Sequence, residues 1–368
     1  MRNAISDTTT RLRAVYKKNE RYFPLASFIA GFLWDSLTLD RIDRLSDNLI
    51  LLSYIILAGI LIIITSLVAE KKIVHPLIIK YQHFLPNALQ FFFGGLFSSY
   101  VVYYFKSAAL TKNWLFLVFL FLLLVSNEFI RDRIKVFYMQ IIFYYLALFS
   151  FFIFFLPVVF KTISAWLFIG SGLMSSGLTA GMIFFLGKKI DGDYHSRLKP
   201  LIKPLLAIFV FFHLIYFTNI IPPVPLSLKY AGTFHSVQKV EDGYRLSYNE
   251  PAWYQFFTVS DNPFYFTEKD SVYCFSAVFA PTDLKTRIYH HWQWYNPKKE
   301  EWQTTDRLSY SIRGGRANGY RGYTYKKNIV AGEWRVDIEN DQGQVLGRVS
   351  FEAIKEEKAT RRRVTQLR

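Results

Sequence analysis

The chain has a single cysteine, Cys274, among its 368 residues. One cysteine cannot form an intramolecular disulfide, so a disulfide-stapled secreted module is excluded and any folded part depends on an ordinary hydrophobic core. The sequence also lacks a glycine-rich phosphate loop, a cluster of metal ligands and a recognisable set of nucleophile and base. We therefore predict no catalytic residues, no metal and no cofactor, and these absences favour a non-enzymatic protein.

Apolar runs of membrane length are absent after residue 221, although the chain before it is rich in them. Hydrophobic residues make up 52% of the sequence, with 36 Phe and 24 Tyr, which exceeds the usual range of globular domains. Most of the apolar runs approach or exceed the roughly 20 residues that cross a bilayer. The candidate spans are residues 23–39, 48–69, 84–105, 113–130, 136–160, 163–186 and 204–221. The sequence thus predicts an all-α membrane bundle of seven transmembrane helices over residues 23–221.

Excess positive charge is absent from the polar half of the chain, although the net charge of the whole is +16. Residues 229–354 carry 16 Lys/Arg against 15 Asp/Glu, and phosphate-backbone binding needs a basic surface, so no nucleic-acid partner is expected. Between the spans, one side of the membrane collects 17 Lys/Arg and the other 5. The positive-inside rule then places the basic segment 1–22 in the cytoplasm and residues 229–368 outside, with the lipid bilayer as a partner.

The polar half begins after three prolines, Pro222, Pro223 and Pro225. Each lacks an amide donor and fixes φ, so residues 222–229 are predicted to form a stiff, extended spacer. Eight strand candidates follow, at residues 234–240, 244–248, 272–280, 286–296, 301–312, 320–326, 333–339 and 344–354. Strands without intervening helices predict an all-β, antiparallel, immunoglobulin-like sandwich over residues 230–354. The tail, residues 355–368, carries six Lys/Arg and is predicted to be disordered.

Two carboxylates and a histidine lie within the candidate spans: Asp35, Glu128 and His213. Such groups are costly in a membrane and often functional, which keeps a transporter or a lipid- or glycan-processing enzyme open as an alternative. Asp35 also suits a helix cap, Glu128 an ion pair with Arg131, and His213 a hydrogen bond to a carbonyl of a neighbouring helix.

Small residues recur in the sixth span, where Gly177 and Gly181 form a GxxxG pattern. Small residues let helices approach closely, so this span is predicted to pack centrally in the bundle.

The strongest binding candidates lie in the polar half, where aromatic residues stand beside arginines. They are Tyr289, His291, Trp292, Trp294, Arg313, Arg316, Arg321 and Tyr323. Aromatic faces beside guanidinium groups suit sugar rings, acidic glycans or phosphate-bearing lipid head groups. The alternative is that the tryptophans form core and the Arg/Gly run is a solvated hairpin. His290 and His291 are adjacent and point to opposite faces of one strand, so they make a poor metal site.

The run GEWRVDIENDQGQVLGRVSFEAI, preceded by HHWQWYN and RGYTYKKN, resembles the C-terminal module of an uncharacterised bacterial family, domain of unknown function 2914. The runs GFLWDSLTLDRID, FFFGGLFSSYVVYYFKSA and SNEFIRDR resemble the membrane part of its multi-pass members. The family residues that recur are His291, Trp292, Arg321 and Trp334. The resemblance implies the bacterial inner membrane but no activity. The leading hypothesis is a membrane protein whose periplasmic sandwich recognises an envelope glycan, an anionic lipid or a protein partner.

Overall fold

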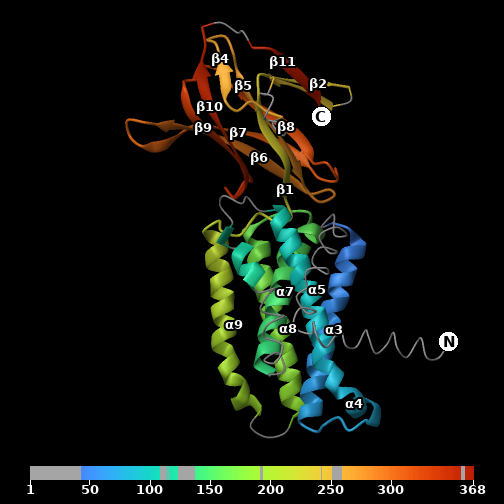
Figure 1. The fold of residues 1–368 in the computed structure, drawn as a ribbon. Helices are drawn as coiled ribbons and strands as arrows, with labels where there is room; N and C mark the ends of the chain where they lie inside the picture. The colour runs from blue at the N-terminus through green and yellow to red at the C-terminus, as the bar shows by residue number, and fades with distance from the viewer. Residues whose placement is uncertain are drawn as a thin grey trace, which may run out of the picture. The chain divides into compact units, whose positions relative to one another are not determined.

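Figure 1 shows the helices and strands of the chain in a computed structural model. The structure describes residues 43–107, 114–115, 117–122, 137–190, 194–241, 243–250, 259–357 and 361–368. The chain divides into two compact units. The first comprises Met1–Val102, Phe119–Phe151 and Met174–Leu206, and the second comprises Tyr103–Val118, Phe152–Leu173 and Ala207–Arg368.

Five long helices are apolar enough to cross a membrane. They are α3 (Leu45–Ala69), α5 (Leu85–Ser107), α7 (Phe137–Phe160), α8 (Ala165–Lys189) and α9 (Tyr194–Phe217), with the short helix α4 (Pro76–Tyr81) and the 3-10 helix η1 (Gln82–Phe84) between α3 and α5. They match the second, third, fifth, sixth and seventh predicted spans. The first span, 23–39, lies outside the described residues, and residues 114–115 and 117–122 of the fourth are helical. The helices indicate a membrane protein, and the count of seven stays a prediction.

Helix α9 begins ten residues before the predicted start at Pro204 and contains both Pro200 and Pro204. Each proline removes one backbone hydrogen bond, but an apolar surrounding offers the remaining amides no partner other than their own helix. The helix therefore runs through both prolines, and its membrane-length part, Lys199–Phe217, begins and ends before the predicted span 204–221 does.

The most buried of the five helices is α7. In its most apolar window 78% of the residues are buried, against 33% for α8. Close approach occurs at other glycines: a Cβ added at Gly59 would meet the ring of Tyr144, and one at Gly95 would meet the ring of Tyr54. A Cβ added at Gly177 or Gly181 meets nothing within 4 Å in the described part of the chain. The prediction that the GxxxG helix packs centrally is therefore wrong for the described residues.

The C-terminal part of the second unit is built from eleven described strands. They are β1 (Ser227–Phe234), β2 (Ser236–Val240), β3 (Gly243–Asn249), β4 (Phe264–Phe266), β5 (Val272–Phe279), β6 (Lys285–Asn296), β7 (Glu301–Arg313), β8 (Tyr320–Lys326), β9 (Gly332–Glu339), β10 (Val345–Lys355) and β11 (Arg363–Leu367). They form three sheets, in the orders β1-β5-β8, β4-β10-β9-β6-β7 and β11-β3-β2. All pairs are antiparallel except β10 with β4, which is parallel. A β-sheet domain is confirmed, and its immunoglobulin-like topology stays a prediction.

Two hydrophobic clusters lie between the β1-β5-β8 sheet and the five-stranded sheet, and alternation along the strands builds both. One cluster consists of Phe264, Phe266, Val272, Cys274, Trp292, Trp334, Val336, Phe351 and Ala353. The other consists of Leu226, Val278, Ala280, Leu284, Ile288, Ile312, Ile338 and Leu346. A smaller cluster of Phe234, Val237, Leu246 and Phe275 joins the β11-β3-β2 sheet to the β1-β5-β8 sheet. The domain therefore has a third layer that the sequence did not indicate.

Two glycines shape the hairpin of β9 and β10. The turn between β9 and β10 contains Gly343 at a φ of 76°, and the register of that pair shifts between Val345 and Gly347. A β-bulge therefore lies at the start of β10, next to Gly347.

The proline segment is not an extended spacer. The amide of Val224 donates to the carbonyl of Pro222 (2.8 Å), and that of Leu226 donates to the carbonyl of Pro223 (2.9 Å). Residues 221–227 are buried, and β1 already begins at Ser227. Prolines lack an amide donor, but their carbonyls still accept hydrogen bonds. The amides of Val224 and Leu226 therefore close turns within the segment.

The tail is not fully disordered either, because β11 occupies Arg363–Leu367 and pairs antiparallel with β3. The amide of Tyr244 donates to the carbonyl of Arg368 (2.7 Å), and the amide of Arg368 donates back to the carbonyl of Tyr244 (2.9 Å). The basic composition indicated solvation, but backbone pairing with an open sheet edge needs no apolar sequence.

Candidate functional site

The predicted binding residues of strand β6 lie on the two opposite faces of the five-stranded sheet. Ile288, His290 and Trp292 are fully buried, whereas Tyr289 and His291 are half-buried on the outer face of the five-stranded sheet. Alternation along one strand separates neighbouring side chains in this way. The expected opposition of His290 and His291 is observed.

The two tryptophans of β6 belong to the core. Trp292 donates its indole N–H to Thr324 Oγ1 (3.1 Å), and Trp294 packs against the same cluster and donates to the carbonyl of Ala331 (3.3 Å). Trp334 is buried in that cluster as well. The structure thus does not bring the tryptophans together with Tyr289 and His291.

The four remaining soluble candidates lie at and after the end of β7. Arg313 is exposed and donates to Asp283 (2.8 Å). The guanidinium of Arg316 lies 4.9 Å from the centre of the Tyr320 ring. On β8, Gly322 and Thr324 are buried while Tyr323 and Tyr325 are exposed, so Arg321 shares the outward side with the two tyrosines. The charges of Arg316 and Arg321 both lower the pKa of Tyr244, whose ring centre lies 6.1 Å from that of Tyr323, so these residues gather at one side of the β1-β5-β8 sheet.

Arg316, Arg321 and Tyr323 belong to what we name the tyrosine–arginine surface, which consists of Tyr244, Tyr273, Arg316, Tyr320, Arg321, Tyr323 and Tyr325. The ring centres of Tyr323 lie 6.1 Å from Tyr244 and 6.0 Å from Tyr273, and those of Tyr273 and Tyr325 lie 5.4 Å apart. Tyr323 is 37% and Tyr325 48% exposed. Exposed rings that already contact one another present apolar faces to a ligand with little loss of side-chain freedom.

The tyrosine–arginine surface is positively charged. Burial raises the pKa of Tyr244, the neighbouring Tyr320 and Tyr323 raise it further, and the charges of Arg316 and Arg321 lower it. The ion pairs among the described residues do not include Arg316 or Arg321. A guanidinium that no carboxylate occupies can bind an anionic ligand without first losing a partner.

A second group of polar residues, which we name the histidine cluster, lies on the outer face of the five-stranded sheet. His291 Nδ1 lies 2.9 Å from Glu339 Oε1, and His291 Nε2 lies 2.8 Å from Thr304 Oγ1. Arg307 Nε donates to the other carboxylate oxygen of Glu339 (3.2 Å), and its guanidinium stacks on Tyr289 at 4.1 Å. The side chain of Glu339 is 8% exposed and that of His291 is 20% exposed. The imidazole is therefore held between a buried carboxylate and an exposed hydroxyl.

A β-bulge brings Thr304 into this cluster. In the pairing of β6 with β7, Trp292 faces Asp306 but Gln293 faces Thr304, so Thr305 is the extra residue. The Thr305 hydroxyl donates to the carbonyl of Trp292 (3.2 Å). A bulge re-aims the side chains that follow it, and here it turns Thr304 to the face that carries His291.

Next to the histidine cluster, Arg335 Nε donates to Gln293 Oε1 (2.6 Å) and its guanidinium stacks on Trp302 at 4.1 Å. Burial lowers the pKa of Arg335, and the charge of Arg348 lowers it further. Arg348 makes a two-point contact with the buried Asp337, at 2.6 and 2.8 Å, and this hydrogen bonding raises the pKa of Arg348. Sequence reasoning missed Thr304, Gln293 and Glu339, because only strand register and the bulge place them beside His291.

A buried serine–histidine pair lies inside the β-sheet domain. His290 Nε2 lies 2.8 Å from Ser276 Oγ, His290 Nδ1 lies 2.9 Å from Thr324 Oγ1, and Ser276 Oγ lies 2.6 Å from the Tyr310 hydroxyl. His290 and Ser276 are 0% exposed. Burial lowers the pKa of His290 to about 3, so the imidazole is neutral. A substrate has no access to this pair, which stabilises the core.

The membrane candidates do not form a site in the described residues. His213 Nδ1 lies 2.7 Å from the carbonyl of Phe209, one turn earlier on the same helix, and not from a neighbouring helix as expected. Asp35 and Glu128 lie outside the described residues. In the part of the chain that the structure describes, no group of three or more His, Cys, Asp or Glu could hold a metal ion.

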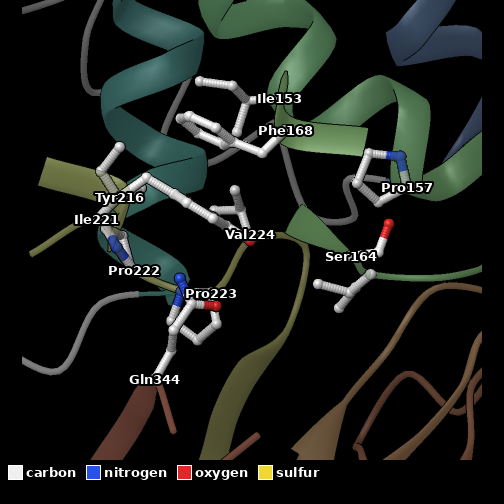
Figure 2. Close-up of a pocket in the computed structure, with 11 residues that line it drawn as sticks. Ile153, Pro157, Ser164, Phe168, Tyr216, Ile221, Pro222, Pro223, Val224 and Gln344 are labelled. Atoms are coloured by element: carbon white, nitrogen blue, oxygen red, sulfur yellow. The ribbon is translucent and has the colours of Figure 1, made fainter. Parts of the chain in front are cut away.

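Figure 2 shows a cavity of about 20 Å³ in the second unit. It is lined mainly by apolar side chains, among them Phe168, Ile221 and Val224. A cavity of this size holds about one water molecule, so it is too small for an organic ligand.

Comparison with known proteins gives one family match. Residues 285–353, from β6 to Ala353 in β10, match a family described as "Protein of unknown function (DUF2914)". The matched segment contains the whole histidine cluster together with Arg316, Arg321 and Tyr323. A search of curated proteins returned no match.

Among solved structures, the chain is similar to the Pseudomonas fluorescens alkylpurine DNA glycosylase AlkC bound to DNA containing an abasic site analog. The identity is 10%, the match covers 76% of this chain and 83% of that chain, and the TM-score is 0.22. A likeness this weak carries no argument.

Proposed function

We propose that the chain is a multi-pass protein of the bacterial inner membrane, with seven spans and a cytoplasmic N-terminus. Its immunoglobulin-like domain faces the periplasm and recognises an anionic saccharide of the envelope. The apolar helices, the 17 to 5 distribution of Lys/Arg and the resemblance of the runs before residue 135 to multi-pass proteins support the location. The tyrosine–arginine surface supports the recognition.

The observation that carries the ligand class is a row of contacting tyrosine rings, with Tyr323 and Tyr325 exposed, beside two arginines that belong to none of the ion pairs among the described residues. A saccharide ring presents C–H groups that pack on aromatic faces, and its hydroxyls hydrogen-bond to the phenol groups. A phosphate or carboxylate on the saccharide accepts two hydrogen bonds from one guanidinium. Tyr323, between Tyr244 and Tyr273, is placed for the ring, and Arg316 and Arg321 are placed for the anion.

Charge pairing distinguishes this surface from the outer face of the five-stranded sheet. There, Arg307 is paired with Glu339 and Arg348 with Asp337, and Arg335 is held by Gln293 and the Trp302 ring, so an anion would have to compete with a partner at each of these arginines. Removing one partner from a buried ion pair costs about 3–5 kcal/mol. The tyrosine–arginine surface carries no such cost at Arg316 or Arg321, and we therefore assign anion recognition to it.

Retention of the full-length protein in lipid nanodiscs on immobilised saccharides tests the proposal. We expect retention on a phosphorylated envelope polysaccharide, and weaker retention on a neutral dextran. Each hydrogen bond to a charged group contributes about 1.5–3 kcal/mol, so R321A should weaken binding by about tenfold to a hundredfold. Y323A should also weaken it, because the ring loses its stacking face.

The matched control is R287A, because Arg287 is an exposed arginine on the other sheet. Equal loss of retention in R287A and R321A would show that only overall charge matters. Nanodiscs that contain anionic lipid, tested without polysaccharide, distinguish a lipid head group as the source of the anion.

A further inference from the structure

We propose that Thr304, His291 and Glu339 form an acyl-transfer site that hydrolyses short-chain carboxylic esters. The inference goes beyond the proposed function and does not depend on it, because the histidine cluster lies on a different sheet from the tyrosine–arginine surface. The three side chains have the connectivity of a nucleophile, a base and a residue that orients the base. They come from β7, β6 and β9, so the fold and not the local sequence assembles them.

The hydrogen bonds assign one role to each residue. Glu339 accepts from His291 Nδ1, which leaves the lone pair of Nε2 directed at the Thr304 hydroxyl, 2.8 Å away. Thr304 is exposed on β7, where an ester can approach it. Both distances lie within the range that a nucleophile and its base require before reaction.

Two arginine–aromatic stacks hold this arrangement in place. Arg307 bonds to Glu339 and stacks on Tyr289, which fixes the carboxylate behind the imidazole. Arg335 bonds to Gln293 Oε1 and so turns the Gln293 amide nitrogen toward the cluster, 3.4 Å from His291 Nε2. One N–H of this amide donates to His291 Nε2, and the other can stabilise the oxygen of a carbonyl that Thr304 attacks.

The reaction takes two steps, and each is balanced. In the first, Thr304 Oγ forms a bond to the ester carbon, the bond from that carbon to the alkoxy oxygen breaks, and His291 passes the hydroxyl proton of Thr304 to the leaving alcohol. In the second, a water molecule attacks the acyl carbon and gives one proton to His291. The bond to Thr304 Oγ breaks, Thr304 regains the proton from His291, and the carboxylic acid leaves.

The surroundings of Thr304 favour a small acyl group on a large alcohol. The hydroxyl stands on a solvent-exposed edge strand and not at the bottom of a deep pocket, so an O-acetyl group on a bulky polar molecule can reach it. The positive charge of Arg307 beside Glu339 weakens the electrostatic stabilisation that the carboxylate gives to a protonated His291. Esters, whose alcohols leave more readily than amines, are therefore the fitting substrate class.

The test uses the full-length protein in nanodiscs with p-nitrophenyl acetate, followed by peptide mapping of acetylated residues by mass spectrometry. We expect an acetyl group on Thr304 and turnover that falls about 100-fold or more in T304A and in H291Q. T304S keeps a hydroxyl and should retain turnover, with the acetyl group at the same position. Q293A should lose about 10²- to 10³-fold, because one donor to the developing oxyanion is removed.

S309A is the control, because Ser309 is another exposed hydroxyl on β7. Turnover by T304A at the wild-type rate, or acetylation that maps to lysines and tyrosines but not to Thr304, would overturn the proposal. Thr304 is exposed, so T304A should fold, which its thermal unfolding by tryptophan fluorescence checks. The two proposals can fail independently. If R321A still binds the saccharide as the wild type does, the proposed function fails, while ester hydrolysis that depends on Thr304 would still support the acyl-transfer site.

Discussion

His290 and His291 are neighbours in sequence but differ in chemistry, and the difference comes from the strand that carries them. His290 lies in the core with its two nitrogens bound to Ser276 and Thr324, whereas His291 is partly exposed and bound to Glu339 and Thr304. The sequence predicted their opposite faces from the period of a strand. It did not predict their partners, because these residues belong to other strands and depend on register.

The buried His290 should make the stability of the β-sheet domain depend on pH. Its folded pKa is about 3, and its unfolded value is about 6.5. Below about pH 6.5 the unfolded chain therefore binds a proton that the folded domain does not bind until about pH 3. The free energy of unfolding should fall as the pH falls through this window, by up to about 1.4 kcal/mol per pH unit.

Urea denaturation followed by tryptophan fluorescence measures this slope. H290Q carries no titrating group at that position, so its slope should be smaller than that of the wild type. H291Q is the matched control at the partly exposed neighbour and should keep the steep dependence that His290 causes. Equal slopes in the wild type and H290Q would show that His290 is not the group responsible.

At the scale of elements, the length of the apolar runs predicted where the helices lie. The residue composition predicted the first and last residues of helices and strands poorly. All five described membrane-length helices fall on predicted spans, because a run of about 20 apolar residues has few alternatives. Helix α9 starts ten residues before the predicted span 204–221, because the span was bounded by its apolar residues whereas the helix includes the polar segment that precedes them. Strands β1, β4 and β11 were missed, since short or polar strands owe their pairing to tertiary neighbours and not to their own pattern.

Strand β11 allows a direct test of whether the basic C-terminal residues are disordered or pair with β3 at the edge of the third sheet. Because Arg363–Leu367 pairs with β3, every second amide of this segment should be protected from hydrogen exchange. V364P removes a donor and distorts the strand, so it should release the protection of the whole segment. Hydrogen–deuterium exchange with mass spectrometry makes the measurement, and rapid exchange of residues 363–367 in the wild type would contradict the pairing.

At the scale of the whole molecule, orientation follows from charge and not from any contact. The proposed topology predicts that K298C, in the β-sheet domain, reacts with a membrane-impermeant maleimide from the periplasmic side. K189C, at the end of α8, should react only after the membrane is opened. Cys274 gives no background, because it is fully buried and burial raises the pKa of its thiol. Labelling of K189C but not K298C from the periplasm would reverse the topology.

The tyrosine–arginine surface was predicted in part. Sequence reasoning selected Arg316, Arg321 and Tyr323, because an Arg/Gly run with aromatics suggested a binding loop. It missed Tyr244 and Tyr273, which lie far from these three residues in the sequence. They reach the surface through the third sheet and through the pairing of β5 with β8. It also joined this surface to Tyr289 and His291, which the structure places on the other sheet.

The most direct test of the proposed recognition is a pair of titrations on the full-length protein, with one saccharide in its phosphorylated and its unphosphorylated form. We predict that the wild type binds the phosphorylated form about tenfold or more tightly, and that R321A removes most of this preference while R287A keeps it. Equal affinity of the wild type for the two forms, or a preference that R321A leaves unchanged, would contradict the account.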